Sequence, residues 1–309
     1  MSLPPATVPA DLPLAPRVAP RVARLEGPPL RLLIVEGNTI DARRAVEASG
    51  GTVACVLYEQ VLLALAPAGS TCATICPGDP DGDTLPAGLD WAQIDGVAST
   101  GSALSVYWDR PEVHRQIAFH ARVFDSGRPA FGSCWALQVA AVVAGGTVAA
   151  NPRGREVGLA RKVTLTEAGR AHPLHDGRPP AFDAVAIHGD EVTRPPAGMT
   201  CLSGNAVSPV QAADIRHGNG MFWGVQYHPE FSLRDIGPLC RRYREQLIAD
   251  GLAADTAAVA RHAEVLETLG ADPGRRDLAW RLGIDHDVLD DARRLTEIRN
   301  WLVHQVLPA

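Results

Sequence analysis

Short runs of hydrophobic residues recur along the first two thirds of the chain. Residues 31–37 (RLLIVEG) form a continuous apolar run that ends in glycine, a pattern typical of a strand buried on both faces of a parallel sheet. Helical patterns separate several of these runs, and strands that alternate with helices predict an α/β domain with a largely parallel sheet. The further strands are predicted at 52–57, 94–99, 129–132, 184–187 and 221–227, and the helices at 40–49, 111–126 and 135–145.

This alternation stops at residues 146–215. The strand-like segments here, 159–166, 199–204 and 207–215, are separated by clusters of Pro and Gly instead of helices. An antiparallel extension of the sheet fits this pattern better than further parallel strands.

From about residue 238 onward the pattern becomes helical. Leu295, Ile298, Leu302 and Val306 follow helical spacing and predict one apolar stripe on a terminal helix. The helical segments are predicted at 238–250, 256–270, 275–282 and 292–307.

Composition divides the chain into three parts. Residues 1–29 alternate Pro, Ala and Val with scattered Arg. Such a composition buries too little apolar surface to offset the conformational entropy lost on ordering, and we expect a flexible tail. We expect one α/β domain over residues 30–240 and a helical C-terminal extension over residues 241–309.

The charge balance is mildly acidic. The chain has 29 basic and 35 acidic side chains, a formal net charge of −6, which gives no global reason to bind nucleic acid or a membrane surface. No segment approaches the roughly 20 apolar residues that cross a bilayer, and the N-terminal residues lack the apolar run of a secretory signal. We therefore expect a cytoplasmic protein.

The cysteines and most histidines do not suggest a metal site. Cys72 and Cys76 lack a second pair at zinc-ligand spacing, and most cysteines are predicted to be small buried hydrophobes. His172, His175 and His217 are predicted to be ordinary surface or loop side chains.

One cysteine has a different setting. In residues 128–146 a short strand meets Gly132-Ser133-Cys134, and an apolar helix begins at once. A side chain at such a turn lies at the carboxyl end of the sheet, beside a helix amino terminus that favours a thiolate. Taken alone, the segment supports a nucleophile and a core cysteine about equally.

Residues 220–232 offer a partner for that thiol. His228 and Glu230 are two residues apart, so on an extended chain they point the same way and the carboxylate can orient the imidazole. Together with Cys134 they match the logic of a nucleophile, a base and an orienting acid. The alternative is that His228 and Glu230 lie on an exposed strand end with local hydrogen bonds.

These residues carry a family resemblance. GSCWALQ (132–138) and QYHPE (226–230) resemble the G-x-C-x-G-x-Q and Q-x-H-P-E motifs of class I glutamine amidotransferases. Three further segments, 95–107, 154–158 and 188–192, are similar in order to segments of the amidotransferase domain of GMP synthase. The resemblance implies a flavodoxin-like domain: a mostly parallel sheet flanked by helices, with the antiparallel extension and the helical C-terminal appendage added.

The resemblance also implies roles. Cys134 would attack the glutamine side-chain amide to form a γ-glutamyl thioester, His228 would act as general acid and base, and Glu230 would orient His228. It implies no metal ion and no cofactor. The N–H groups of Ser102 and Trp135 would form the oxyanion hole, and Gly101, Gln138, His188 and Gly189 would contact the substrate.

Two positions depart from the family pattern. Ala136 stands where the cysteine motif usually has a second glycine, and Ser102-Ala103 stands where GMP synthase has Gly-Pro. Ser102 still offers its N–H, which is all that an oxyanion hole requires. Arg155 and Glu156 are predicted to form a structural ion pair.

The sequence leaves several functions open. No G-x-x-x-x-G-K-[ST] loop is found and few residues follow 240, so ammonia released from glutamine would go to a separate synthetase subunit. The alternative is a free-standing hydrolase of γ-glutamyl peptides or amides; a noncatalytic regulatory protein is a third hypothesis. Residues 278–284 and 290–301 also resemble a helix-turn-helix, although acidic residues in the turn disfavour DNA. A homo-oligomer also remains open.

Overall fold

The computed structural model describes residues 20–307. Most of the predicted tail, residues 1–19, lies outside this range. Residues 20–29 contain no helix or strand, and the Leu25 N–H donates a hydrogen bond to the Leu65 carbonyl at 2.7 Å. The described end of this segment therefore lies against the folded part of the chain.

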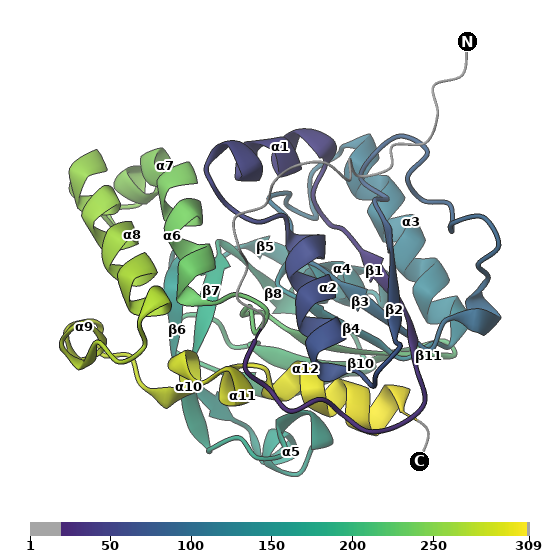
Figure 1. The fold of residues 1–309 in the computed structure, drawn as a ribbon. Coiled ribbons are helices and arrows are strands. Elements are labelled where there is room, and N and C mark those ends of the chain that lie inside the picture. The colour runs from purple at the N-terminus through teal and green to yellow at the C-terminus, as the bar shows by residue number, and fades with distance from the viewer. Residues whose placement is uncertain (1–19, 308–309) are drawn as a thin grey trace.

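A nine-stranded sheet forms the centre of the fold (Figure 1). Its order is β2-β1-β3-β4-β11-β10-β9-β6-β7; the first five strands are parallel and the pairs from β11 to β7 are antiparallel. This confirms the predicted α/β fold with its antiparallel extension. The strands are β1 Arg31–Val35, β2 Thr71–Ile75, β3 Gly96–Ser99, β4 Ala130–Ser133, β5 Thr147–Ala150, β6 Glu156–Leu165, β7 Ala181–His188, β8 Asp190–Arg194, β9 Met199–Gly204, β10 Ala212–His217 and β11 Gly220–Val225, with β5 and β8 forming a separate pair.

Helices cover both faces of this sheet. Side chains of α2 and α12 share one hydrophobic cluster with the sheet, and α3 and α4 share a second cluster on the other face. A third cluster joins α6 and α8. The helices are α1 Ile40–Ala48, α2 Ala54–Leu65, α3 Pro111–Ser126, α4 Trp135–Val143, α5 Glu167–Arg170, α6 Leu233–Arg242, α7 Arg244–Ala249, α8 Thr256–Ala271, α9 Arg276–Leu282, α10 His286–Leu289, α11 Asp291–Arg294 and α12 Thr296–Trp301, with 3-10 turns at Trp91–Gln93 and Pro173–His175 and a π-helical turn at Leu302–Val306.

One predicted strand is wrong. Residues 52–57 begin helix α2, and the edge strand is β2 at Thr71–Ile75. A short apolar run is compatible with either structure, and here the apolar positions continue at helical spacing as far as Leu65. The Glu36 carboxylate, which accepts the Cys55 N–H at 2.7 Å, also stabilises the start of this helix. The buried positions of α2 are Ala54, Cys55, Leu57, Tyr58, Val61, Leu62 and Leu65.

The terminal apolar stripe is confirmed. Leu295, Ile298 and Leu302 are fully buried and Val306 is 8% exposed, all in the cluster that α2 shares with the sheet. The predicted helix is broken at Leu295 into α11 and α12. A DNA-recognition helix must present its side chains to solvent, so the burial of Ile298 and Trp301 argues against the helix-turn-helix hypothesis.

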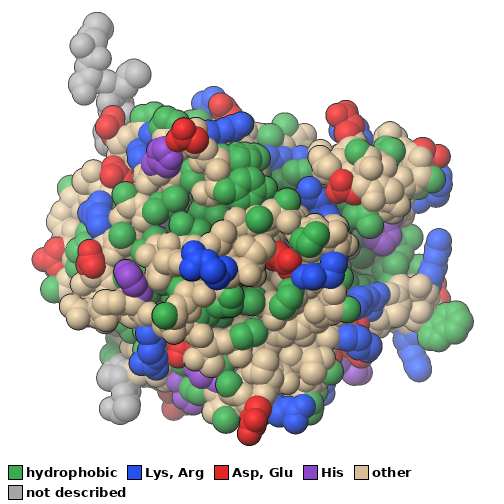
Figure 2. Space-filling view, turned by 180° about the vertical axis from the view of Figure 1, so that it is seen from behind, with side chains coloured by type: hydrophobic (Ala, Val, Ile, Leu, Met, Phe, Trp, Pro, Cys, Tyr) green, Lys and Arg blue, Asp and Glu red, His purple; other side chains and the backbone are tan. Residues whose placement is uncertain are grey.

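The surface carries mixed charges. On the face opposite to that of Figure 1, basic and acidic side chains are interspersed (Figure 2). Within residues 20–307, no helix combines the length and the apolar character that a bilayer crossing demands. No group of three or more His, Cys, Asp or Glu side chains that could hold a metal ion is found among the same residues.

His175 differs from its prediction as a surface or loop histidine. It is 4% exposed, and neither ring nitrogen has a hydrogen-bond partner among the described residues. Burial lowers the pKa of His175 to about 4. Its position in a polar, Pro-rich stretch gave no sign that α12 would cover it.

Candidate active site

Cys134 lies in the turn between β4 and α4. Its φ of 53° and ψ of −108° are unusual for a residue with a side chain, and its N–H donates to the Val225 carbonyl at 2.7 Å. The turn requires glycine at position 132, where a Cβ atom would lie 2.5 Å from the Ala136 Cβ and 2.8 Å from the Ser99 carbonyl oxygen. This strand-to-helix elbow holds the thiol at the carboxyl end of the parallel strands, as the sequence predicts.

His228 and Glu230 lie between β11 and α6. His228 Nδ1 is 2.7 Å from Glu230 Oε1, and the two residues are 3% and 2% exposed. The Phe231 ring stacks on the imidazole with centroids 4.3 Å apart. This burial contradicts the alternative of an exposed strand end.

The imidazole also lies beside the thiol. A Cβ atom built at Gly101 would lie 2.7 Å from His228 Cε1 and 3.6 Å from Cys134 Cβ, so the Gly101 backbone contacts both side chains. Burial opposes the charged imidazolium, but the Glu230 carboxylate and the Cys134 side chain outweigh it and raise the pKa of His228 to about 10. His228 therefore carries a proton at neutral pH that it can give to a leaving group.

Two residues that the sequence analysis did not select support Glu230. The Ser133 hydroxyl donates to Glu230 Oε1 at 2.8 Å, and the Tyr58 hydroxyl lies 2.7 Å from Ser133 Oγ. Burial raises the pKa of Tyr58 well above its usual range, so this hydroxyl keeps its proton. Ser133 could have been suspected because it precedes Cys134, whereas Tyr58 comes from α2 and gave no sequence signal.

The loop after β3 approaches the same point. The Gly101 carbonyl accepts hydrogen bonds from Thr100 Oγ1 at 2.9 Å and from Asn38 Nδ2 at 3.3 Å. The predicted oxyanion donor Ser102 lines a cavity of about 310 Å³ together with Cys134 and His228. The other predicted donor, the Trp135 N–H, is at the first residue of α4, directly after Cys134.

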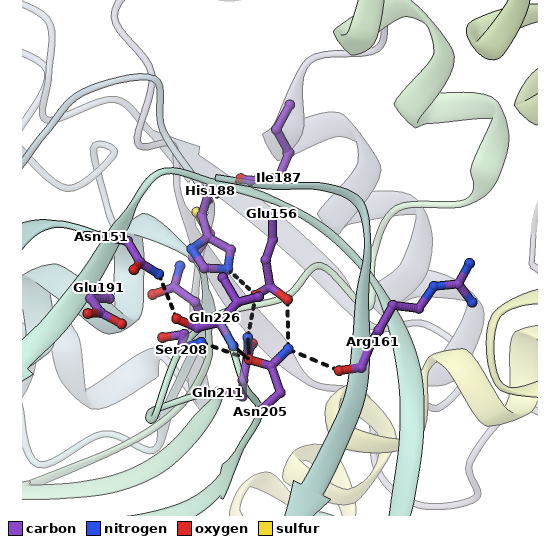
Figure 3. A network of polar contacts seen from close by, with 12 residues as sticks. Asn151, Glu156, Arg161, Ile187, His188, Glu191, Asn205, Ser208, Gln211 and Gln226 are labelled. Atoms are coloured by element: carbon purple, nitrogen blue, oxygen red, sulfur yellow. Dashed lines mark hydrogen bonds and ion pairs between the residues drawn. The ribbon is translucent and has the colours of Figure 1, made fainter. Parts of the chain in front are cut away.

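A polar network surrounds Glu156 and His188 (Figure 3), and His188 also lines this cavity. Gln138 Nε2 donates to Gln226 Oε1 at 3.1 Å and to the Asp190 carbonyl at 3.2 Å. His188 uses both ring nitrogens, contacting the Asp190 carbonyl at 3.0 Å and Glu156 Oε2 at 2.8 Å. The structure thus brings Gln138, His188 and Gly189 to the cavity, but the His188 ring already has two protein partners.

Arg155 and Glu156 do not form the predicted ion pair. Arg155 Nε donates to Asp250 Oδ2 at 3.0 Å, and its guanidinium lies against the Gly189 backbone. Glu156 instead accepts hydrogen bonds from Asn205 at 2.6 Å and from Gln211 at 2.5 Å, besides contacting His188. Successive side chains on an extended chain point in opposite directions, which separates the two.

Another part of the cavity lining comes from helices. Residues of α1, α2, α6 and α7 contribute to it, and most of these side chains are apolar or aromatic. The sequence did not indicate these helices as part of the site. Helices α6 and α7 follow the last motif, and α1 and α2 contain no motif. The lining residues in and between these helices include Val46, Leu57, Leu239, Arg242, Tyr243 and Gln246.

Comparison with known proteins identifies the family. Residues 102–242 match the family model "Glutamine amidotransferase class-I". A "Gamma-glutamyl-L-1-hydroxyisopropylamide hydrolase" from Pseudomonas sp is 36% identical over 285 residues, which are 90% of this chain and 94% of that protein. The chain belongs to the class I glutamine amidotransferase family. This confirms the predicted family and the predicted enzyme class.

Other relatives of this amidotransferase match it less completely. A "GMP synthase [glutamine-hydrolyzing]" from Thermomicrobium roseum is 31% identical over 166 residues, 52% of this chain and 29% of the synthase. The chain thus spans less than a third of that synthase. A solved glutamine amidotransferase from Thermotoga maritima has a TM-score of 0.58 at 16% identity, covering 90% of this chain and 99% of its own, and therefore shares the fold.

The contact between Glu230 and His228 gives a pH prediction. In Glu230→Gln the amide no longer stabilises the imidazolium, so the pKa of His228 is expected to fall from about 10. The proton needed by the leaving group is then lost at lower pH, and kcat should fall about 10²- to 10⁴-fold. The measurement is the pH profile of kcat/KM for amide hydrolysis, whose alkaline limb should move to lower pH.

Glu191→Gln provides the matched control. Glu191 is also buried, at 4% exposure, but its carboxylate pairs with Arg153 at 2.9 Å and does not line the cavity. Its profile should keep the wild-type alkaline limb. An unchanged limb in Glu230→Gln would contradict the assigned orienting role.

Proposed function

We propose that this amidotransferase hydrolyses γ-glutamyl amides and releases glutamate and a small amine. One observation carries this proposal: helices beyond the last family motif line the cavity at Cys134. The similarity to the γ-glutamyl amide hydrolase covers 90% of the chain and so extends into these helices, whereas that to the T. roseum GMP synthase covers 52%. The C-terminal segment then acts as the wall of an amine pocket.

The reaction follows from the arrangement of three side chains. The Cys134 thiolate attacks the γ-carbonyl carbon, and the negative charge that forms on the carbonyl oxygen is stabilised by the N–H groups of Ser102 and Trp135. His228 gives its proton to the leaving nitrogen, the C–N bond breaks, and a γ-glutamyl thioester and a free amine result. Water then gives a proton to His228 and attacks the thioester, which releases glutamate and regenerates Cys134.

The cavity lining offers both kinds of contact that such a substrate needs. The α-amino and α-carboxylate groups of a glutamyl unit need polar partners, which Gln138, Gly189 and Asp190 offer. An alkyl group on the leaving nitrogen gains from burial against Leu57, Leu239 and similar side chains.

A second function is favoured by the GMP synthase relatives. The same three side chains would release ammonia from glutamine, and a separate synthetase subunit would consume it. This interpretation predicts slow turnover of glutamine by the isolated chain and a sharp rise on adding the partner. The hydrolase interpretation predicts full activity without a partner.

The test compares substrates that differ only in the leaving amine. The isolated protein is assayed for release of glutamate from glutamine and from γ-glutamyl alkylamides such as the isopropylamide. Burial of the alkyl group is expected to make kcat/KM at least about 10-fold higher for the alkylamide. A preference for glutamine, or activity only in the presence of a cell-extract fraction, would favour the ammonia-supplying subunit instead.

A further inference from the structure

The side chain of Asn38, which also lines the cavity, holds the peptide group between Gly101 and Ser102. We propose that Asn38 is a positioning residue that locks this peptide so that the Ser102 N–H points at the reacting carbonyl. This inference rests on the proposed function, in which Ser102 is an oxyanion donor.

The Asn38 side chain brackets Ser102 on both sides. Its Nδ2 donates to the Gly101 carbonyl at 3.3 Å, and its Oδ1 accepts the Ala103 N–H at 3.0 Å. Thr100 Oγ1 adds a second hydrogen bond to the Gly101 carbonyl at 2.9 Å. The loop therefore has little freedom to rotate at residue 102.

Because the peptide group is planar and trans, fixing the Gly101 carbonyl also fixes the direction of the Ser102 N–H. The carbonyl of Gly101 and the N–H of Ser102 belong to one planar unit and point in opposite directions. Residues 20–307 contain no cis peptide bond, and the Ser102 N–H makes no hydrogen bond to any of them. With the carbonyl tied to Asn38 Nδ2, the free N–H is turned away from that nitrogen, and the Gly101 backbone beside it contacts Cys134 and His228.

Asn38 is itself held in place by a buried acid. Glu36 is fully buried, and its Oε1 accepts the Asn38 N–H at 2.8 Å and Asn38 Nδ2 at 2.9 Å. Its other oxygen accepts the Cys55 N–H at 2.7 Å, at the start of α2. The carboxylate therefore fixes the orientation of the amide and ties it to a rigid helix.

Gly37 allows the two loops to approach. A Cβ atom at residue 37 would lie 2.8 Å from the Gly101 carbonyl oxygen, closer than a side chain permits, and the Gly37 N–H donates to Thr100 Oγ1 at 2.8 Å. β1 and β3 are parallel neighbours, so the loops that follow them meet at the same edge of the sheet. This positioning role suits an amide side chain, because it needs a donor for the Gly101 carbonyl and an acceptor for the Ala103 N–H.

The test separates positioning of the oxyanion donor from general damage. Asn38→Ala removes both hydrogen bonds, and Asn38→Leu removes them while filling similar space. In both variants kcat is expected to fall about 10²-fold, the effect of losing one oxyanion donor, with KM changed less than about 3-fold. Affinity for glutamate γ-semialdehyde, whose thiohemiacetal with Cys134 carries the oxyanion, should fall by a similar factor.

Alkylation of Cys134 by iodoacetamide provides the internal standard. This displacement at carbon forms no oxyanion, so its rate should equal the wild-type rate in both variants if they are folded. Asn151→Ala is the matched control, because Asn151 also brackets a loop, donating to the Val207 carbonyl at 2.9 Å and accepting the Arg153 N–H at 2.9 Å outside the cavity. It should keep wild-type kcat.

Two results would overturn the inference. One is unchanged kcat and aldehyde affinity in the Asn38 variants; the other is a loss of alkylation rate that parallels the loss of kcat. Both glutamine and the γ-glutamyl alkylamide are used as substrates. A wild-type preference for glutamine would reject the proposed substrate, whereas the Asn38 effect on kcat and aldehyde affinity would still be measured.

Discussion

Cys134→Ala is expected to abolish hydrolysis of every γ-glutamyl substrate, with kcat reduced by at least about 10⁴-fold. No other group in the cavity can form the thioester, and the oxyanion hole and His228 cannot replace the missing nucleophile. Glutamate release measured at high enzyme concentration tests this expectation. The thermal unfolding midpoint should stay close to the wild-type value, because Cys134 is small and alanine keeps its Cβ.

Cys72→Ala is the matched control for the thiol. Cys72 is a partly buried free cysteine on β2 and does not line the cavity. It should retain wild-type kcat and KM. Substantial turnover by folded Cys134→Ala would remove the covalent mechanism and leave only direct attack by water.

Arg178→Met is expected to lower the free energy of unfolding by about 3–5 kcal/mol, the usual effect of breaking a buried ion pair from one side. Arg178 contacts Glu297 through two hydrogen bonds of 2.7 and 2.8 Å, and the side chains are 3% and 0% exposed. The Tyr227 hydroxyl also donates to Glu297 at 2.9 Å. Without Arg178 the Glu297 carboxylate loses its counter-ion in the core.

Guanidinium denaturation at neutral pH measures the loss. Arg244→Met is the control, because the side chains of Arg244 and Glu245 are 48% and 87% exposed in their pair and its loss should cost about 1 kcal/mol or less. Adding Glu297→Leu to Arg178→Met should recover stability, since it removes the unpaired charge. If Arg178→Met lowered the free energy of unfolding no more than the control does, the stabilising role of the Arg178–Glu297 pair would be contradicted.

The same pair predicts an acid dependence of stability. Burial raises the pKa of Glu297, but the Arg178 guanidinium outweighs burial and holds that pKa below its usual value. A lowered pKa in the folded state contributes stability above the unfolded pKa of about 4.3 and loses it as pH falls. Denaturation curves recorded at falling pH should show this loss in the wild type and not in the double variant.

Local signals predicted most of the fold well. Helix α3 occupies Pro111–Ser126 as expected, because Pro111 suits a first helical turn and Gly127 ends the helix with a φ of 64°. Strand β9, Met199–Gly204, also matches its prediction. The prediction failed at α2, where the apolar run over residues 52–57 suits a strand or a helix, and burial on one face made it a helix.

The amino-acid sequence by itself determined which residues the proposed chemistry uses. The proposed nucleophile, base and orienting acid lie in two short segments, 132–138 and 226–230, whose residue types and local turns are set by neighbours in the chain. Such local patterns can be read without knowing which elements pack together.

Only the tertiary structure decided what supports that chemistry. Asn38, Tyr58 and Tyr243 reach the site from the loop after β1, from α2 and from the turn between α6 and α7, none of which carries a motif. The order of strands in the sheet and the packing of α2, α6 and α7 bring them there. The contacts of Asn38 with Gly101 and of Tyr58 with Ser133 join residues 63 and 75 positions apart in the chain. No local periodicity encodes such pairs; they depend on the free energy of packing the whole core.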